Sequence, residues 1–64
     1  MLSDVERKLL RITLNRYRND WHTPDIQLLS QYSQRDNGTV RAGMRRLHEQ
    51  GYLEADGGKI RAVR

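Results

Sequence analysis

Apolar side chains recur with helical spacing most clearly between residues 37 and 50. Val40, Met44 and Leu47 fall together on one side of a helical wheel. The other side carries mostly charged residues, namely Arg41, Ala42, Arg45, Arg46 and Glu49. The pattern predicts a helix over residues 37–50 with one face for the core and one for a partner.

Short polar residues and a glycine mark the ends of this helix. Asp36 or Asn37 can cap its start, because a side-chain oxygen there accepts an amide hydrogen left free in the first turn. Gly51 follows the last periodic residue, where a left-handed conformation closes many helices. We therefore expect the helix to stop near Gln50.

A longer helix is predicted over residues 3–19. Ser3 and Glu6 have the spacing of a capping box. The helix carries two apolar stripes, Val5, Leu9 and Ile12 in one and Leu10, Leu14, Tyr17 and Trp21 in the other. Such a wide apolar arc indicates either a central helix that contacts both others or a helix with one stripe turned to a partner. We favour the central position for a chain this small.

The second helix is expected at about residues 24–32. Thr23 can cap it and Pro24 suits its first position. Its buried positions would be Ile26, Leu29 and Tyr32, with Leu28 at their flank. Residues 33–38 lack apolar side chains and connect this helix to the next.

Two short strands follow, over residues 52–56 and 59–63. The intervening glycines supply the positive φ of a tight turn. Leu53, Ala55, Ile60 and Ala62 alternate incompletely, which leaves the register open by one residue. Since an isolated hairpin is marginally stable, this one must pack on the helices. The chain is thus expected to be mostly α with a small β-hairpin, a single domain over residues 1–64.

Composition excludes several classes of function. At 64 residues nearly all apolar side chains are needed for packing, which leaves little for a catalytic cavity. The chain has no cysteine, and neither His22 nor His48 has ligands at metal-binding spacing. Without a catalytic constellation, membrane span or signal peptide, we expect a cytoplasmic, non-enzymatic protein without cofactor, metal or membrane contact. No effector-binding domain is expected after Val63, and hence no small-molecule ligand.

The charge favours a polyanionic partner. The net charge is +4, and most cations are arginine, whose guanidinium suits phosphates and guanine edges. Residues 35–64 hold seven cations and four anions, against five and four in residues 1–34. The excess therefore lies mainly with the third helix and the hairpin.

The order helix, turn, helix, helix, hairpin resembles a winged helix-turn-helix domain. Residues 39–54, TVRAGMRRLHEQGYLE, are similar to the pattern T-V-R-x-[AG]-[LM]-R-x-L-x-x-x-G-[LY]-[LIV]-x of GntR-type repressors. The turn differs, because the segment from Tyr32 to Val40 is one residue longer and holds Ser33 and Gln34 in place of the usual glycine and apolar residue. In this it is closer to the LexA type.

The resemblance implies a three-helix winged helix-turn-helix that binds duplex DNA without catalysis. The third helix would enter the major groove, and the wing at about residues 52–63 would touch the adjacent backbone or minor groove. The chain would then be a small transcriptional or replication regulator, such as a repressor. The DNA-contacting residues would be Asn37, Gly38, Thr39, Arg41, Arg45, Arg46, Lys59 and Arg61.

Other interpretations remain open. Arg45 and Arg46 have the spacing to pair with Glu49 on the helix surface. The same scaffold can also serve as a protein-protein interaction module, in which the helix over residues 3–19 or the hairpin binds a partner protein or a second copy of the chain. Glu54 and Asp56 lower the positive charge of the wing, and an excess of exposed apolar surface on the helix over residues 3–19 would favour this alternative.

Overall fold

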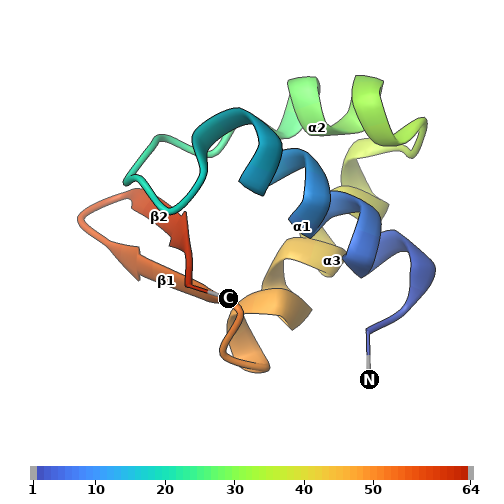
Figure 1. Cartoon of the computed structure of the whole chain (residues 1–64). Coiled ribbons are helices and arrows are strands. Elements are labelled where there is room, and N and C mark those ends of the chain that lie inside the picture. Colours follow the sequence, from blue (N-terminus) through green and yellow to red (C-terminus); the bar gives the residue numbers. More distant parts are fainter. Residues whose placement is uncertain (1, 64) are drawn as a thin grey trace.

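The computed structural model describes residues 2–63 as three helices followed by a two-stranded antiparallel hairpin (Figure 1). In chain order the elements are α1 (Asp4–Tyr17), α2 (Ile26–Ser33), α3 (Asn37–Glu49), β1 (Leu53–Asp56) and β2 (Lys59–Ala62). The prediction of a mostly helical chain with a small hairpin is confirmed. Within this described part, no helix has the length and apolar character needed to cross a membrane.

The capping box predicted for α1 is present, but the helix is shorter than residues 3–19. The N–H of Glu6 donates to the Ser3 hydroxyl, and the N–H of Ser3 donates to the Glu6 carboxylate, both at 3.2 Å. At the other end Arg18 has a φ of 55°, and its N–H donates to the Leu14 carbonyl at 2.9 Å. This positive φ ends the helix two residues before the predicted boundary.

The start of α2 also differs from the prediction, because Asp25 rather than Thr23 is the cap. Its carboxylate accepts from the N–H of Leu28 at 3.1 Å. Upstream, His22 is paired with Ile60 of β2 through two main-chain hydrogen bonds of 2.9 and 2.8 Å. This pairing keeps the segment before α2 extended, so Pro24 lies outside the helix.

The buried face of α2 is rotated from the predicted one. Leu29 is buried and Ile26 is half-buried, as expected. Tyr32, however, is 58% exposed, and Ser33 is buried in its place. Since Ile26, Leu29 and Ser33 are spaced i, i+3 and i+7, they form one helical face toward the core. The aromatic ring of Tyr32 was wrongly assigned to that face because it is apolar.

Both ends of α3 follow the sequence signals closely. Asp36 caps the start by accepting from the N–H of Thr39 at 3.3 Å. At the other end Gly51 has a φ of 82°. The N–H of Tyr52 donates to the Leu47 carbonyl at 2.9 Å and that of Gly51 to the His48 carbonyl at 3.1 Å. These two bonds form a Schellman motif, which turns the chain directly into β1.

The register of the hairpin, which the sequence left open by one residue, is fixed in the structure, and the alternation is incomplete because Ala55 is exposed. Leu53 lies opposite Ala62, and Ala55 opposite Ile60. Gly57 and Gly58 have φ values of 58° and 81°, the two positive values that a type I′ turn requires. Leu53 and Ala62 are buried, so the hairpin packs on the helices as predicted.

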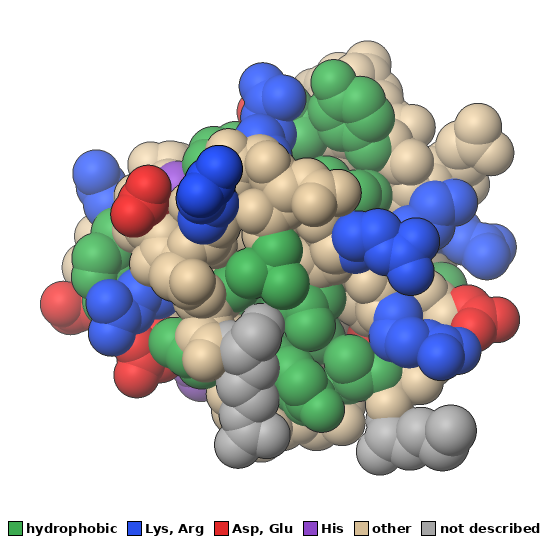
Figure 2. Space-filling model, viewed as in Figure 1, with side chains coloured by type: hydrophobic (Ala, Val, Ile, Leu, Met, Phe, Trp, Pro, Cys, Tyr) green, Lys and Arg blue, Asp and Glu red, His purple; other side chains and the backbone are tan. Residues whose placement is uncertain are grey.

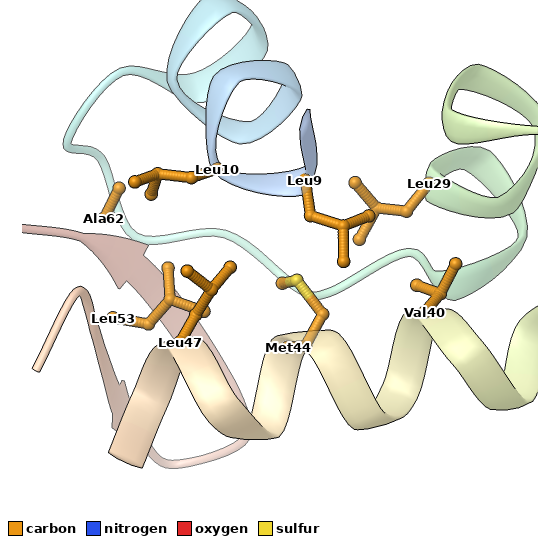
Figure 3. Packing of buried hydrophobic residues seen from close by; sticks show 8 residues of the cluster. All are labelled: Leu9, Leu10, Leu29, Val40, Met44, Leu47, Leu53 and Ala62. Atoms are coloured by element: carbon orange, nitrogen blue, oxygen red, sulfur yellow. The ribbon is translucent and has the colours of Figure 1, made fainter. Parts of the chain in front are cut away.

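The core lies where α1 crosses α3 (Figure 3). Its buried residues come from every helix and from the hairpin: Leu9, Leu10, Leu29, Val40, Met44, Leu47, Leu53 and Ala62. α1 contacts α2, α3 and β2, which gives it the central position favoured above. At the crossing, a Cβ on Gly43 would lie 2.6 Å from Cδ1 of Leu9, closer than two carbon atoms can approach. Gly43 therefore permits the close contact of the two helices.

Glu6 ties the start of α1 to the end of α3. Its side chain is almost fully buried, accepts from Nε2 of Gln50 at 3.3 Å and lies 3.7 Å from Nη1 of Arg46. The hydrogen bond from the N–H of Ser3 is the main cause that lowers the pKa of this carboxyl below its ordinary value of 4.5.

The lowered pKa predicts how stability depends on pH. The ionised carboxylate stabilises the fold above pH 4.5, and this stabilisation is lost as the pH falls through that value toward the folded-state pKa. The urea concentration at the unfolding midpoint should therefore decrease as the pH is lowered from neutral to 3. This decrease should be smaller in Glu6→Gln. An unchanged pH profile in this variant would show that Glu6 does not contribute to acid sensitivity.

Candidate nucleic-acid interface

Arg41 and Arg45 lie one turn apart on the exposed face of α3. Val40, Met44 and Leu47 point to the opposite side and are buried, so the core fixes which way the two arginines project. Within residues 2–63 neither guanidinium has an intramolecular hydrogen bond or ion pair. Both are available to a ligand, and the predicted pairing of Arg45 with Glu49 does not form.

The two arginines line an open groove between α3 and the hairpin, with a volume of about 300 Å³. The other residues that line the groove are His48 and Met44 of α3, Leu53, Ala55 and Ile60 of the hairpin, and Pro24 and Ile26 before and at the start of α2. The groove thus combines an apolar floor with a positively charged rim. Sequence reasoning assigned no role to His48, although its spacing from Arg41 and Arg45 places it on the same helical face.

The start of α3 is less open to DNA than the sequence predicted. Asn37 and Gly38 are exposed, but Thr39 is half-buried and its hydroxyl donates to the capping carboxylate of Asp36. This hydrogen bond is the main cause that lowers the pKa of Asp36 below its ordinary value of 3.8, and the carboxylate is ionised at neutral pH. A negative charge therefore lies at the helix end where Asn37 and Thr39 were expected to contact DNA, and it would repel a phosphate there.

Arg46 is exposed but lies toward α1, away from the other two arginines. Its Nη1 is 3.7 Å from Oε2 of the buried Glu6, so its charge is partly balanced within the chain. The predicted alternative partner Glu49 is not used. Arg46 does not line the groove.

The two predicted cations of the hairpin differ in their surroundings. Nε of Arg61 lies 2.7 Å from Oε1 of Glu54, and the guanidinium sits over the Trp21 ring, 4.7 Å from its centroid. Lys59 is exposed at the turn, and its ammonium group makes no ion pair within the described residues. Of the two, Lys59 is the one free to bind an anion.

Positive charge is not confined to α3. Lys8 and Arg11 project from the exposed side of α1, beside the pair formed by Arg7 and Asp4 at 2.6 Å. In the space-filling view, Lys and Arg side chains project at several places, with hydrophobic patches between them (Figure 2). The α3 surface is therefore distinguished by its two unpaired arginines on an apolar groove, more than by charge alone.

No group of three His, Asp or Glu side chains that could hold a metal ion is found among residues 2–63. Comparisons of the chain with protein-family models, with characterised proteins and with solved structures gave no match in any of the three.

Proposed function

We propose that this chain is a winged helix-turn-helix domain that binds duplex DNA without catalysis, as a small regulator of transcription or replication. In this arrangement α3 enters the major groove and the hairpin, as the wing, lies over the adjacent backbone or minor groove. The observation that carries the proposal is the pair Arg41 and Arg45, which are exposed, one turn apart and unpaired within the described residues.

The chemistry of these two side chains supports a nucleic-acid ligand. A guanidinium can bind a phosphate or form two hydrogen bonds with O6 and N7 of guanine. Arg46 and Arg61, in contrast, each have an acidic partner within the chain. The dimensions also agree, because a helix with its side chains is about 10–12 Å wide and the major groove is about 12 Å wide.

The hairpin is positioned to contribute from one side of α3. The Schellman motif leads α3 into β1 through only Gln50, Gly51 and Tyr52, and the groove is lined by both elements. Lys59 offers a free ammonium group at the turn. Glu54 and Asp56 are exposed on β1, so we expect the hairpin to supply fewer phosphate contacts than α3.

A partner protein bound through α1 has less support. Leu10 is buried and Leu14 is half-buried. The ring of Tyr17 stacks on that of His22, with the two ring centroids 3.7 Å apart. Most of the apolar arc of α1 is therefore used within the chain. Trp21, at 41% exposed, lies beyond the helix and is covered on one side by Arg61.

The proposal is tested by titrating a fluorescently labelled duplex with the protein and following anisotropy at low and at physiological salt. We expect binding that weakens steeply as salt rises, because cations on the protein displace counterions from the phosphates. A chain that fails to bind duplex DNA even at low salt, where non-specific affinity is greatest, would refute the proposal. Unlabelled duplex should compete with the probe, whereas a neutral polymer should not.

A further inference from the structure

The groove between α3 and the hairpin continues the core to the surface. Met44 and Leu53 belong to the core and also line the groove. Ala55 and Ile60 lie opposite each other in the hairpin, on the same face as Leu53. Since Ala55 is exposed and Ile60 is half-buried, the fold leaves this apolar floor open to water.

The rim of the groove on α3 is positively charged. Arg41, Arg45 and His48 line it at positions i, i+4 and i+7 of the helix. Among the described residues that line the groove, none is acidic. The two guanidinium groups therefore lie next to an apolar floor, with no carboxylate of the groove to neutralise them.

We propose that the groove binds a small amphipathic carboxylate. Its apolar body covers Ala55, Ile60 and Ile26. Its carboxylate group binds Arg41 and Arg45, so the ligand and a DNA duplex exclude each other. This exclusion rests on the proposed function, whereas the binding site itself does not.

Both parts of the groove contribute to this choice of ligand. Apolar surface removed from water stabilises a complex in proportion to the area buried, so the floor favours an apolar body. A carboxylate accepts two parallel hydrogen bonds from a guanidinium, and such charged hydrogen bonds are roughly twice as strong as neutral ones. A simple anion uses only the rim, and a neutral apolar compound uses only the floor.

The size of the groove agrees with a small ligand. Its volume of about 300 Å³ lies at the lower end of the range of roughly 300–1,000 Å³ that is typical of small-molecule sites. A small-molecule ligand was not expected from the sequence, because no effector-binding domain was expected after Val63. The groove offers a site within the domain itself, formed by three segments that are far apart in the chain.

Three probes separate the two requirements of the site. Octanoate has an alkyl chain and a carboxylate, octanol has only the chain, and acetate has only the carboxylate. In NMR titrations, octanoate should shift the methyl signals of Ala55, Ile26 and Ile60. We expect octanol and acetate to need concentrations at least about tenfold higher for the same shift, because each lacks one of the two contacts.

Competition with DNA is measured by anisotropy of the fluorescently labelled duplex. At an octanoate concentration about ten times its dissociation constant, the apparent Kd of the duplex should rise about tenfold, because the two ligands share one site. Sodium acetate at the same concentration is the control for ionic strength, which itself weakens duplex binding. Acetate should have a much smaller effect than octanoate.

Three variants locate the site. Ala55→Gln places a polar side chain on the floor and should weaken octanoate binding about fourfold or more, the effect of one methylene group returned to water. Val63→Thr is the matched control, because Val63 is an exposed apolar residue after β2 that does not line the groove. It should bind octanoate like the unchanged protein. In Arg41→Gln with Arg45→Gln, octanoate should bind no better than octanol.

The possible results separate this inference from the proposed function. If octanol binds as tightly as octanoate, or if Ala55→Gln leaves octanoate binding unchanged, the carboxylate site is wrong and the DNA-binding proposal stands. If octanoate weakens duplex binding no more than acetate does, the two ligands do not share Arg41 and Arg45, and the inference is again wrong. If the duplex fails to bind even without octanoate, the proposed function fails, and the NMR titration still decides whether the carboxylate site exists.

Discussion

Replacing Leu9 with alanine should lower the free energy of unfolding by about 2–5 kcal/mol, the range for a buried leucine that leaves a cavity. Leu9 has no exposed surface and lies at the crossing of α1 and α3. A chain of 64 residues is expected to have a total stability of roughly 3–10 kcal/mol. The variant should therefore be close to the limit of folding at room temperature.

The close contact between Leu9 and Gly43 predicts that their substitutions are coupled. Gly43→Ala alone gains about 1 kcal/mol of helix propensity, but its methyl group would lie 2.6 Å from Leu9, and overpacking of this kind costs about 1–3 kcal/mol. We expect a net loss of stability. In a Leu9→Ala background the same methyl group enters the vacated space, so Gly43→Ala should stabilise the chain.

Urea unfolding followed by circular dichroism gives all the free energies of this double-mutant cycle. We expect a coupling energy of about 1–2 kcal/mol between the two positions. Additive effects would show that the helices shift apart to accept the methyl group, and that Gly43 is not required for the crossing.

Replacing Arg41 and Arg45 together with glutamine should weaken duplex binding by roughly 30-fold or more at low salt, since each guanidinium contact is worth about 1–3 kcal/mol. If both bind phosphates, the slope of log affinity against log salt should fall by about 2. The thermal unfolding midpoint should change little, because both side chains are exposed and unpaired within the described residues.

A matched variant separates the contacts of these two arginines from loss of net charge. Arg11→Gln with Arg18→Gln removes the same charge from exposed positions on the α1 side of the molecule. We expect this control to reduce affinity much less. Equal losses in the two double variants would mean that binding depends only on net charge and that α3 is not the binding surface.

The sequence alone predicted the features that depend on neighbouring residues. The capping box at Ser3, the buried stripe of α3, the glycine stop at Gly51 and the two-glycine turn are all present. Each is encoded within a few residues, because caps and tight turns depend on local hydrogen bonds and φ values. For the same reason, the exposure of Arg41 and Arg45 followed from helical periodicity.

The predictions that were wrong, and the features that were not predicted, depend on residues far apart in the chain. Pairing of His22 with Ile60 holds the segment before α2 extended, and the rotation of α2 buries Ser33 rather than Tyr32. No local pattern shows either contact. The apolar groove was missed for the same reason, because three separate segments form it.

In the candidate site too, local patterns predicted which side chains are exposed, whereas contacts between distant segments decide which of them are paired. Helical position favoured Arg41 and Arg45 already in the sequence, but it could not show that Arg46 and Arg61 have partners within the chain. The difference lies in their partners, because Arg46 meets Glu6 of α1, and Arg61 meets Glu54 across the hairpin and Trp21 from the loop after α1. Only the folded chain shows which cations already have partners.

The pairing of His22 with Ile60 has a consequence for folding during protein synthesis. The loop after α1 gains its two main-chain hydrogen bonds only once β2 is available, and Asn19 of the same loop donates to the carbonyl of Ala62 at 2.6 Å. A ribosome releases the loop long before it releases β2. The loop after α1 therefore cannot reach its final conformation until β2 has also left the ribosome.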